Sequence, residues 1–132
     1  MGQNLIVNRS NPLADMEVID FSRDLAGVVL LETEGRFSPY LQVLASLGIQ
    51  RKMVGEDRGF IRQLIAHDRG CVLTIDTLVE RYASEDSCVR PVRNIPPEID
   101  LNPYLVFRTG IDDETRRFAN HVLACLDSCE FI

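Results

Sequence analysis

Short apolar runs alternate with amphipathic segments along this chain of 132 residues, and the alternation limits the folds that the chain can adopt. Residues 27–31 form an uninterrupted apolar run, which is typical of a strand buried on both faces of a sheet. Further strands are expected at 5–7, 49–54, 71–75 and 104–107. The pattern predicts an α/β fold with a mainly parallel sheet and helices on both faces. The strand residues expected to be buried are Val28, Leu30, Val72, Leu73, Leu105 and Val106.

Capping residues mark two helices in the first half of the chain. We expect Ser38 to be the N-cap of a helix that Gly48 ends, and Asp57 to cap a second helix that Gly70 closes. The apolar residues assigned to the inner faces of these helices are Leu41, Leu44, Ala45 and Leu47 in the first, and Phe60, Ile61, Leu64 and Ile65 in the second.

The second half of the chain is more irregular. A short helix is expected at 76–82, and an extended segment at 89–95. Pro91 confines that segment to a sheet edge or a strand start, because proline has no backbone N–H to donate. Acidic residues open a last helix, expected at about 113–128.

Charge and composition exclude several classes of protein. The formal net charge is −6, from 14 basic and 20 acidic residues, which argues against a duplex-binding surface. No apolar run approaches the roughly 18 residues needed to span a bilayer, and no signal peptide is evident at the N-terminus. A cytoplasmic location is therefore expected, with the four cysteines present as reduced thiols.

Several motifs follow one another in an order that resembles a known family. The strand 5–7 leads into Asn11-Pro12-Leu13-Ala14, and Asp24-Leu25-Ala26-Gly27 precedes the buried run. The segments 61–75 and 104–108 and a closing helix around Arg117-Phe118 follow. This order resembles the second subdomain of the effector-binding domain of LysR-type transcriptional regulators, where the first motif usually reads His-Pro-Leu-Ala. Asn11 replaces that histidine here.

The resemblance implies a regulatory module and not an enzyme. It implies that residues 1–132 form a single, periplasmic-binding-protein-like (type 2) α/β domain that senses a small effector, possibly a carboxylate. The DNA-binding helix-turn-helix domain and the first effector subdomain of the family have no counterpart in the sequence, so DNA contact is expected only through a missing domain. Effector domains of the family pair antiparallel, so a homo-oligomer with the helix at 38–47 in or near the contact is expected.

Residues at the strand ends are the candidate effector site. In open α/β sheets, small ligands bind beyond the carboxyl ends of the strands, where helix N-termini supply free N–H groups. The residues at three such ends are Thr33, Glu34, Gly35 and Arg36, then Gly55, Glu56, Asp57 and Arg58, then Thr74. Structural roles are the alternative: Ser38 and Asp57 can be caps only, Gly35 and Gly55 turn residues, and the arginines solvated charges.

Catalytic and metal motifs give little support to other functions. No Gly-x-Ser-x-Gly, Walker or Gly-x-Gly-x-x-Gly motif occurs, and no cofactor is expected. His121, Cys125 and Cys129 share one helical face, but they lack the paired spacings of structural zinc sites, so no metal site is predicted. The alternative function left open is a free-standing small-molecule-binding or enzymatic α/β domain of periplasmic-binding-protein type.

Overall fold

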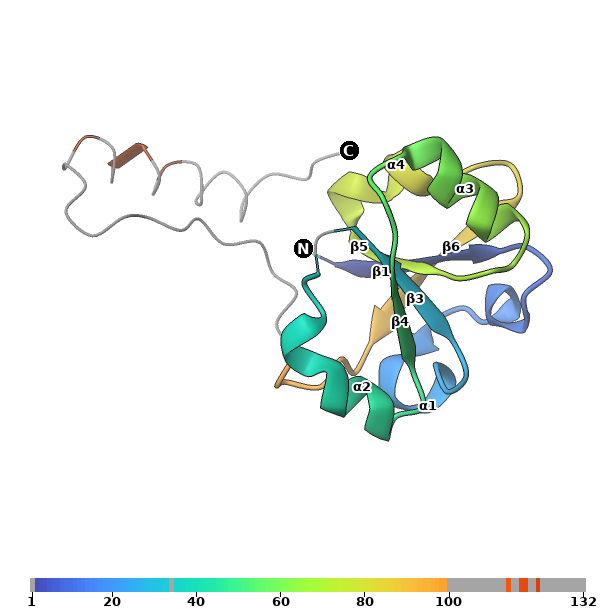
Figure 1. Cartoon of the computed structure of the whole chain (residues 1–132), viewed down its shortest axis with the longest axis horizontal. Coiled ribbons are helices and arrows are strands. Elements are labelled where there is room, and N and C mark those ends of the chain that lie inside the picture. The colour runs from blue at the N-terminus through green and yellow to red at the C-terminus, as the bar shows by residue number, and fades with distance from the viewer. Residues whose placement is uncertain (1, 34, 100–113, 115–116, 119–120, 122–132) are drawn as a thin grey trace.

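The computed structural model describes residues 2–33, 35–99, 114, 117–118 and 121, and it shows a mixed α/β fold (Figure 1). The strands are β1 (Gln3–Asn8), β2 (Ile19–Asp20), β3 (Val29–Glu32), β4 (Gln50–Met53), β5 (Val72–Ile75) and β6 (Ser87–Arg93). The helices are α1 (Phe21–Asp24), α2 (Leu41–Ser46), α3 (Arg58–Ala66) and α4 (Val79–Tyr82), and the 3-10 turns are η1 (Pro12–Asp15), η2 (Ser38–Tyr40) and η3 (Asp76–Leu78).

The strands form a four-stranded sheet in the order β2-β6-β1-β5 and a two-stranded parallel sheet of β3 and β4. A parallel bridge between Leu30 and Cys71 joins the two, so that β3 lies beside β5. β1 runs antiparallel to both of its neighbours, β5 and β6. The prediction of a mainly parallel sheet is therefore not confirmed, because the four-stranded sheet is mixed.

Helices cover both faces of this strand array, as predicted, and each face has its own apolar core (Figure 1). Successive residues of β1 alternate between the cores: Leu5 and Val7 pack with Phe21, whereas Ile6 packs with Ile61. α1 and α2 contribute to the first core, and α3 and α4 to the second. A strand array with both faces buried explains why its strands are apolar at successive positions.

The local signals for α3 agree with the structure. The Asp57 carboxylate accepts a hydrogen bond from the Phe60 amide at 3.1 Å, which confirms Asp57 as the N-cap. α3 ends at Ala66, and the turn that follows places Asp68 in the left-handed region at φ 55°. Gly70 has another reason to be glycine: a Cβ there would lie 2.7 Å from the Leu31 side chain. The strand after α3 can therefore approach β3 closely.

The prediction for the first helix is wrong at its start. Ser38 lies inside the 3-10 turn η2, whose N-cap is Phe37, and no side chain caps this turn. The Phe37 side chain is fully buried in the apolar core. This burial places Phe37, and not Ser38, at the N-cap position of η2. Gly48 follows the helix in the left-handed region, as expected, at φ 73°.

Burial differs from expectation at several apolar positions. Leu30, Val72 and Leu73 are buried as predicted, but Val28, which precedes β3, is only half-buried. On α2 only Leu44 is fully buried, while Ala45 and Leu41 are exposed, so this helix contacts the core along a narrower stripe. The exposed Phe60 lies at the first turn of α3, beyond the edge of its core.

The predicted strand at 104–107, with Leu105 and Val106, lies outside the described residues, as does most of the helix at 113–128.

No helix among the described residues combines the length and the apolar character that crossing a membrane requires.

Candidate functional site at the ends of β3 and β5

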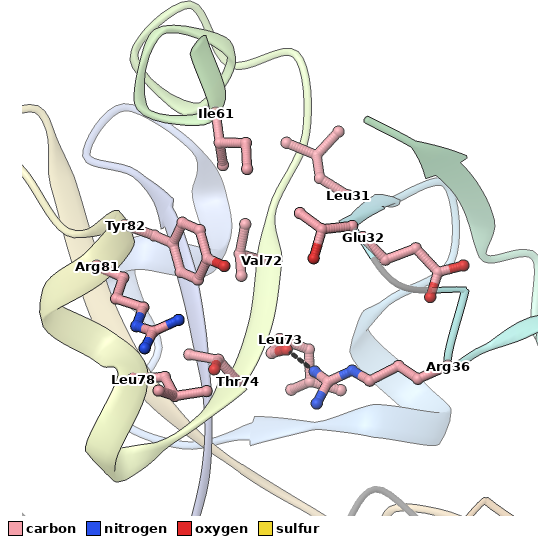
Figure 2. Close-up of a pocket in the computed structure, with 11 residues that line it drawn as sticks. Leu31, Glu32, Arg36, Ile61, Val72, Leu73, Thr74, Leu78, Arg81 and Tyr82 are labelled. Carbon is pink, nitrogen blue, oxygen red and sulfur yellow. Dashed lines mark hydrogen bonds between the residues drawn. The ribbon is translucent and has the colours of Figure 1, made fainter. Parts of the chain in front are cut away.

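A cavity of about 100 Å³ opens where β3 and β5 end, and α3 and α4 form its walls (Figure 2). Apolar side chains form part of the lining: Leu31, Ile61, Val72, Leu73 and Leu78. Polar or charged side chains form the rest: Glu32, Thr33, Arg36, Thr74, Arg81 and Tyr82. An apolar space with a few polar groups is the usual construction of a small-molecule site.

Arg36 reaches the cavity from the loop after β3. Its Nη2 donates to the main-chain oxygen of Leu73 on β5, and its guanidinium carbon lies 5.3 Å from the centre of the Phe37 ring. Figure 2 shows the guanidinium beside Leu73, at the floor of the cavity. A guanidinium carries its N–H donors in a planar fork that matches the oxygens of a carboxylate or phosphate.

Arg81 and Tyr82 reach the cavity from α4, on the side opposite to Arg36 (Figure 2). The side chain of Arg81 is exposed and that of Tyr82 is half-buried. Figure 2 shows the guanidinium of Arg81 and the hydroxyl of Tyr82 directed toward the space between the two walls. Two guanidinium groups thus face one small cavity from opposite sides.

The buried Thr74 completes the floor of the cavity from the end of β5, with 2% of its surface exposed. Its hydroxyl can both donate and accept a hydrogen bond. Hydroxyl donors beside two guanidinium groups favour a carboxylate, phosphate or similar oxyanion.

Three of the residues predicted from the sequence meet in this cavity: Thr33, Arg36 and Thr74. Gly35 lies between Thr33 and Arg36, in the loop that follows β3, and takes φ 71°, a conformation that suits glycine. Glu34 lies outside the described residues. The second predicted loop does not line the cavity: Gly55, Glu56, Asp57 and Arg58 are all exposed, and Asp57 caps α3.

Sequence reasoning missed Arg81 and Tyr82, and it placed Glu32 at the end of the first core strand without selecting it for the site. Arg81 and Tyr82 stand at the end of a predicted helix, not at a strand end, so the rule that locates ligands at strand ends does not select them. The helix after β5 turns back toward β3, and only this turn brings the two residues to the cavity.

No group of three His, Cys, Asp or Glu side chains that could hold a metal ion occurs in the described part of the chain. Cys125 and Cys129 lie outside it, and His121 is an exposed helical residue.

Solved regulatory domains of LysR-family regulators share this layered α/β fold. The regulatory domain of MetR, a LysR family regulator from N. meningitidis, matches with a TM-score of 0.55 and 18% identity, over 70% of this chain and 44% of that chain. The CcmR regulatory domain of Synechocystis PCC6803, solved in complex with 2-PG, matches with a TM-score of 0.54 and 16% identity, over 96% of this chain and 64% of that chain.

The chain thus has the fold of LysR-family regulatory domains and spans between about two fifths and two thirds of the length of these two. No protein-family model matches the sequence, and no curated protein matches it.

Proposed function

We propose that this chain is the effector-sensing part of a LysR-type transcriptional regulator, and that it binds a small anionic molecule in the cavity between β3, β5 and α4. The observation that carries the proposal is the pair of guanidinium groups, Arg36 and Arg81, on opposite walls of a cavity with apolar sides. The ligand would accept hydrogen bonds from both and from the Thr74 and Tyr82 hydroxyls.

The balance of charge supports a local site for anions. The chain as a whole carries a formal charge of −6, so an anion gains little from long-range attraction. Binding therefore depends on groups in direct contact with the ligand, and charge-assisted hydrogen bonds from guanidinium are among the strongest of these. The CcmR regulatory domain was solved with the small molecule 2-PG, which is consistent with a ligand of this size.

The strand directions support the finer proposal of a periplasmic-binding-protein-like subdomain of type 2. β5 and β6 both oppose β1, and the remaining pairings are parallel, so β1 alone runs against the other described strands. In this proposal, a first subdomain would supply the other half of the cleft. DNA contact would belong to a helix-turn-helix domain elsewhere in the parent protein, and the protein would act in the cytoplasm as a homo-oligomer.

Titration of the full chain with inorganic phosphate, followed by NMR of the Thr74 amide, tests the proposal. We expect a saturable shift change whose affinity falls by about tenfold in Arg36→Gln and in Arg81→Gln, because each variant loses a charge-assisted hydrogen bond. Arg23→Gln is the matched control, since Arg23 is exposed, pairs with Asp24 and does not line the cavity. Arg58→Gln tests the second loop. Absence of saturation, or equal losses in the control, would contradict the proposal.

A further inference from the structure

Glu32 is the last residue of β3, and its side chain, which ends in a carboxylate, is 3% exposed. A buried carboxylate is costly unless hydrogen bonds and an opposite charge compensate it. Glu32 is among the residues that line the cavity, but Figure 2 shows its carboxylate directed away from the space between the two walls, so its negative charge lies beside the proposed anion site and not in it. A negatively charged residue repels an anionic ligand, so the position of Glu32 needs another explanation.

The contacts of the Glu32 carboxylate lie within the protein. Oε2 accepts a hydrogen bond from the Phe37 amide at 2.9 Å, and Oε1 lies 3.1 Å from Nε of Arg51 on β4. The first contact joins the end of β3 to a residue five positions later, so it closes the β3 loop, defined here as residues 33–36. The second contact supplies the positive charge that burial of the carboxylate requires.

The closed loop determines where Arg36 points. Phe37 is fully buried, and its amide is held by Glu32, so the residue next to Arg36 is fixed through both side chain and main chain. The Arg36 guanidinium lies over the Phe37 ring and donates to Leu73. Loss of the hydrogen bond between Glu32 and Phe37 would free the loop while leaving every cavity-lining cation in the sequence.

We infer that Glu32 is a positioning residue for the anion site: it does not contact the ligand but holds the β3 loop so that Arg36 faces the cavity. The inference rests on the proposed function above. It makes a prediction opposite in sign to that of simple electrostatics. Removal of a negative charge beside an anion site should strengthen anion binding if charge alone matters, whereas loss of positioning should weaken it.

The experiment is a double-mutant cycle on the full chain, with inorganic phosphate as the probe and the Thr74 amide as the NMR reporter. We expect Glu32→Ala to weaken phosphate binding by about tenfold. In an Arg36→Ala background, the same change should alter affinity by no more than about twofold, because the group that Glu32 positions is gone. Glu32→Gln should stay within about twofold of the unmodified chain or bind more tightly, since the amide oxygen still accepts from Phe37.

Stronger or unchanged binding in Glu32→Ala would overturn the inference, as would an equal loss in both backgrounds. If Glu32→Ala does not fold, the paired change Glu32→Met with Arg51→Met removes the acceptor without leaving an unpaired buried charge, and the same cycle applies.

Hydrogen exchange of the Phe37 amide gives a readout without ligand. It should be slow in the unmodified chain and in Glu32→Gln, and fast in Glu32→Ala. Unchanged exchange of this amide in Glu32→Ala would overturn the inference even if phosphate binds. If exchange changes as expected but the unmodified chain does not bind phosphate, the proposed function fails, and the part of the inference that concerns the ligand fails with it.

Discussion

The side-chain nitrogen of Asn8 donates to the main-chain oxygen of Ala66 at 2.7 Å, and this hydrogen bond joins the end of β1 to the end of α3. The same nitrogen donates to Ile65 O at 3.1 Å, while Oδ1 accepts from the Ser10 amide at 2.8 Å. The last carbonyls of a helix have no partner within the helix. A buried asparagine, 8% exposed, supplies that partner from a distant strand.

Asn8→Ala should lower the free energy of unfolding by about 2 kcal/mol, because buried carbonyls lose their donor. Asn8→Asp should cost more, since a carboxylate would face two carbonyl oxygens and cannot donate to them. Urea denaturation measures both changes. Gln42→Ala, at an exposed position of α2, is the control and should be nearly neutral. Equal stability of Asn8→Asp and the unmodified chain would show that this contact does not hold α3.

Gly70→Ala should destabilise the fold by about 1 to 3 kcal/mol, the usual cost of overpacking a core. The added Cβ would lie 2.7 Å from the Leu31 side chain, where β5 approaches β3. Gly55→Ala is the matched control, because no atom lies within 4 Å of its Cβ position. Chemical denaturation should also show that Gly70→Ala and Leu31→Ala cost less together than the sum of the two, since the second removes the clash.

Alkaline pH should weaken the fold through Cys71. Burial, and secondarily the charge of Asp68, raises the pKa of this thiol from 9.0 to about 12. The folded chain therefore keeps the proton that the unfolded chain releases. The contribution is fully present below pH 9 and is lost as the pH rises from about 9 toward 12. Between pH 8 and pH 10, the free energy of unfolding should fall by about 1 kcal/mol more in the unmodified chain than in Cys71→Ala. Parallel pH profiles of the two chains would contradict this.

We expect the chain to form a dimer or a larger species with α2 in or near the contact. Leu41 at the start of α2 is 44% exposed, and among the described strands β4 pairs only with β3, which leaves an open sheet edge. Leu41→Asp should shift the population toward the monomer, and Gln42→Asp, one residue along the helix, should not. Light scattering at high concentration measures the mass. A monomer there would exclude this prediction.

The chain alone should not bind DNA selectively. Its formal charge of −6 opposes phosphate contact. Gel-shift titration at physiological salt with a pool of random duplexes should give no saturable, sequence-selective complex. Selective binding would overturn both this prediction and the assignment of DNA contact to another domain.

The sequence by itself determined the features that act over a few residues. Asp57 caps α3 because its carboxylate reaches an amide three positions later, and Gly48 follows α2 because that turn needs a positive φ. Apolar runs located β3 and β5 because strands buried on both faces are mostly apolar, and the buried polar residues Glu32 and Thr74 lie at or near the ends of these two strands. Strand ends then selected Thr33, Arg36 and Thr74, which do meet in one cavity.

Tertiary structure decided everything that depends on partners distant in sequence. The residue pattern of β1 does not identify its neighbours, and its antiparallel position between β5 and β6 depends on pairing with residues 66 to 87 positions away. Phe37 occupies the N-cap position of η2 because burial of its side chain in the core outweighed the preference of N-cap positions for serine. Arg81 joined Arg36 only because α4 folds back over β5. Local propensity acts within a turn or two of chain, whereas packing of two apolar cores fixes which distant side chains share a cavity.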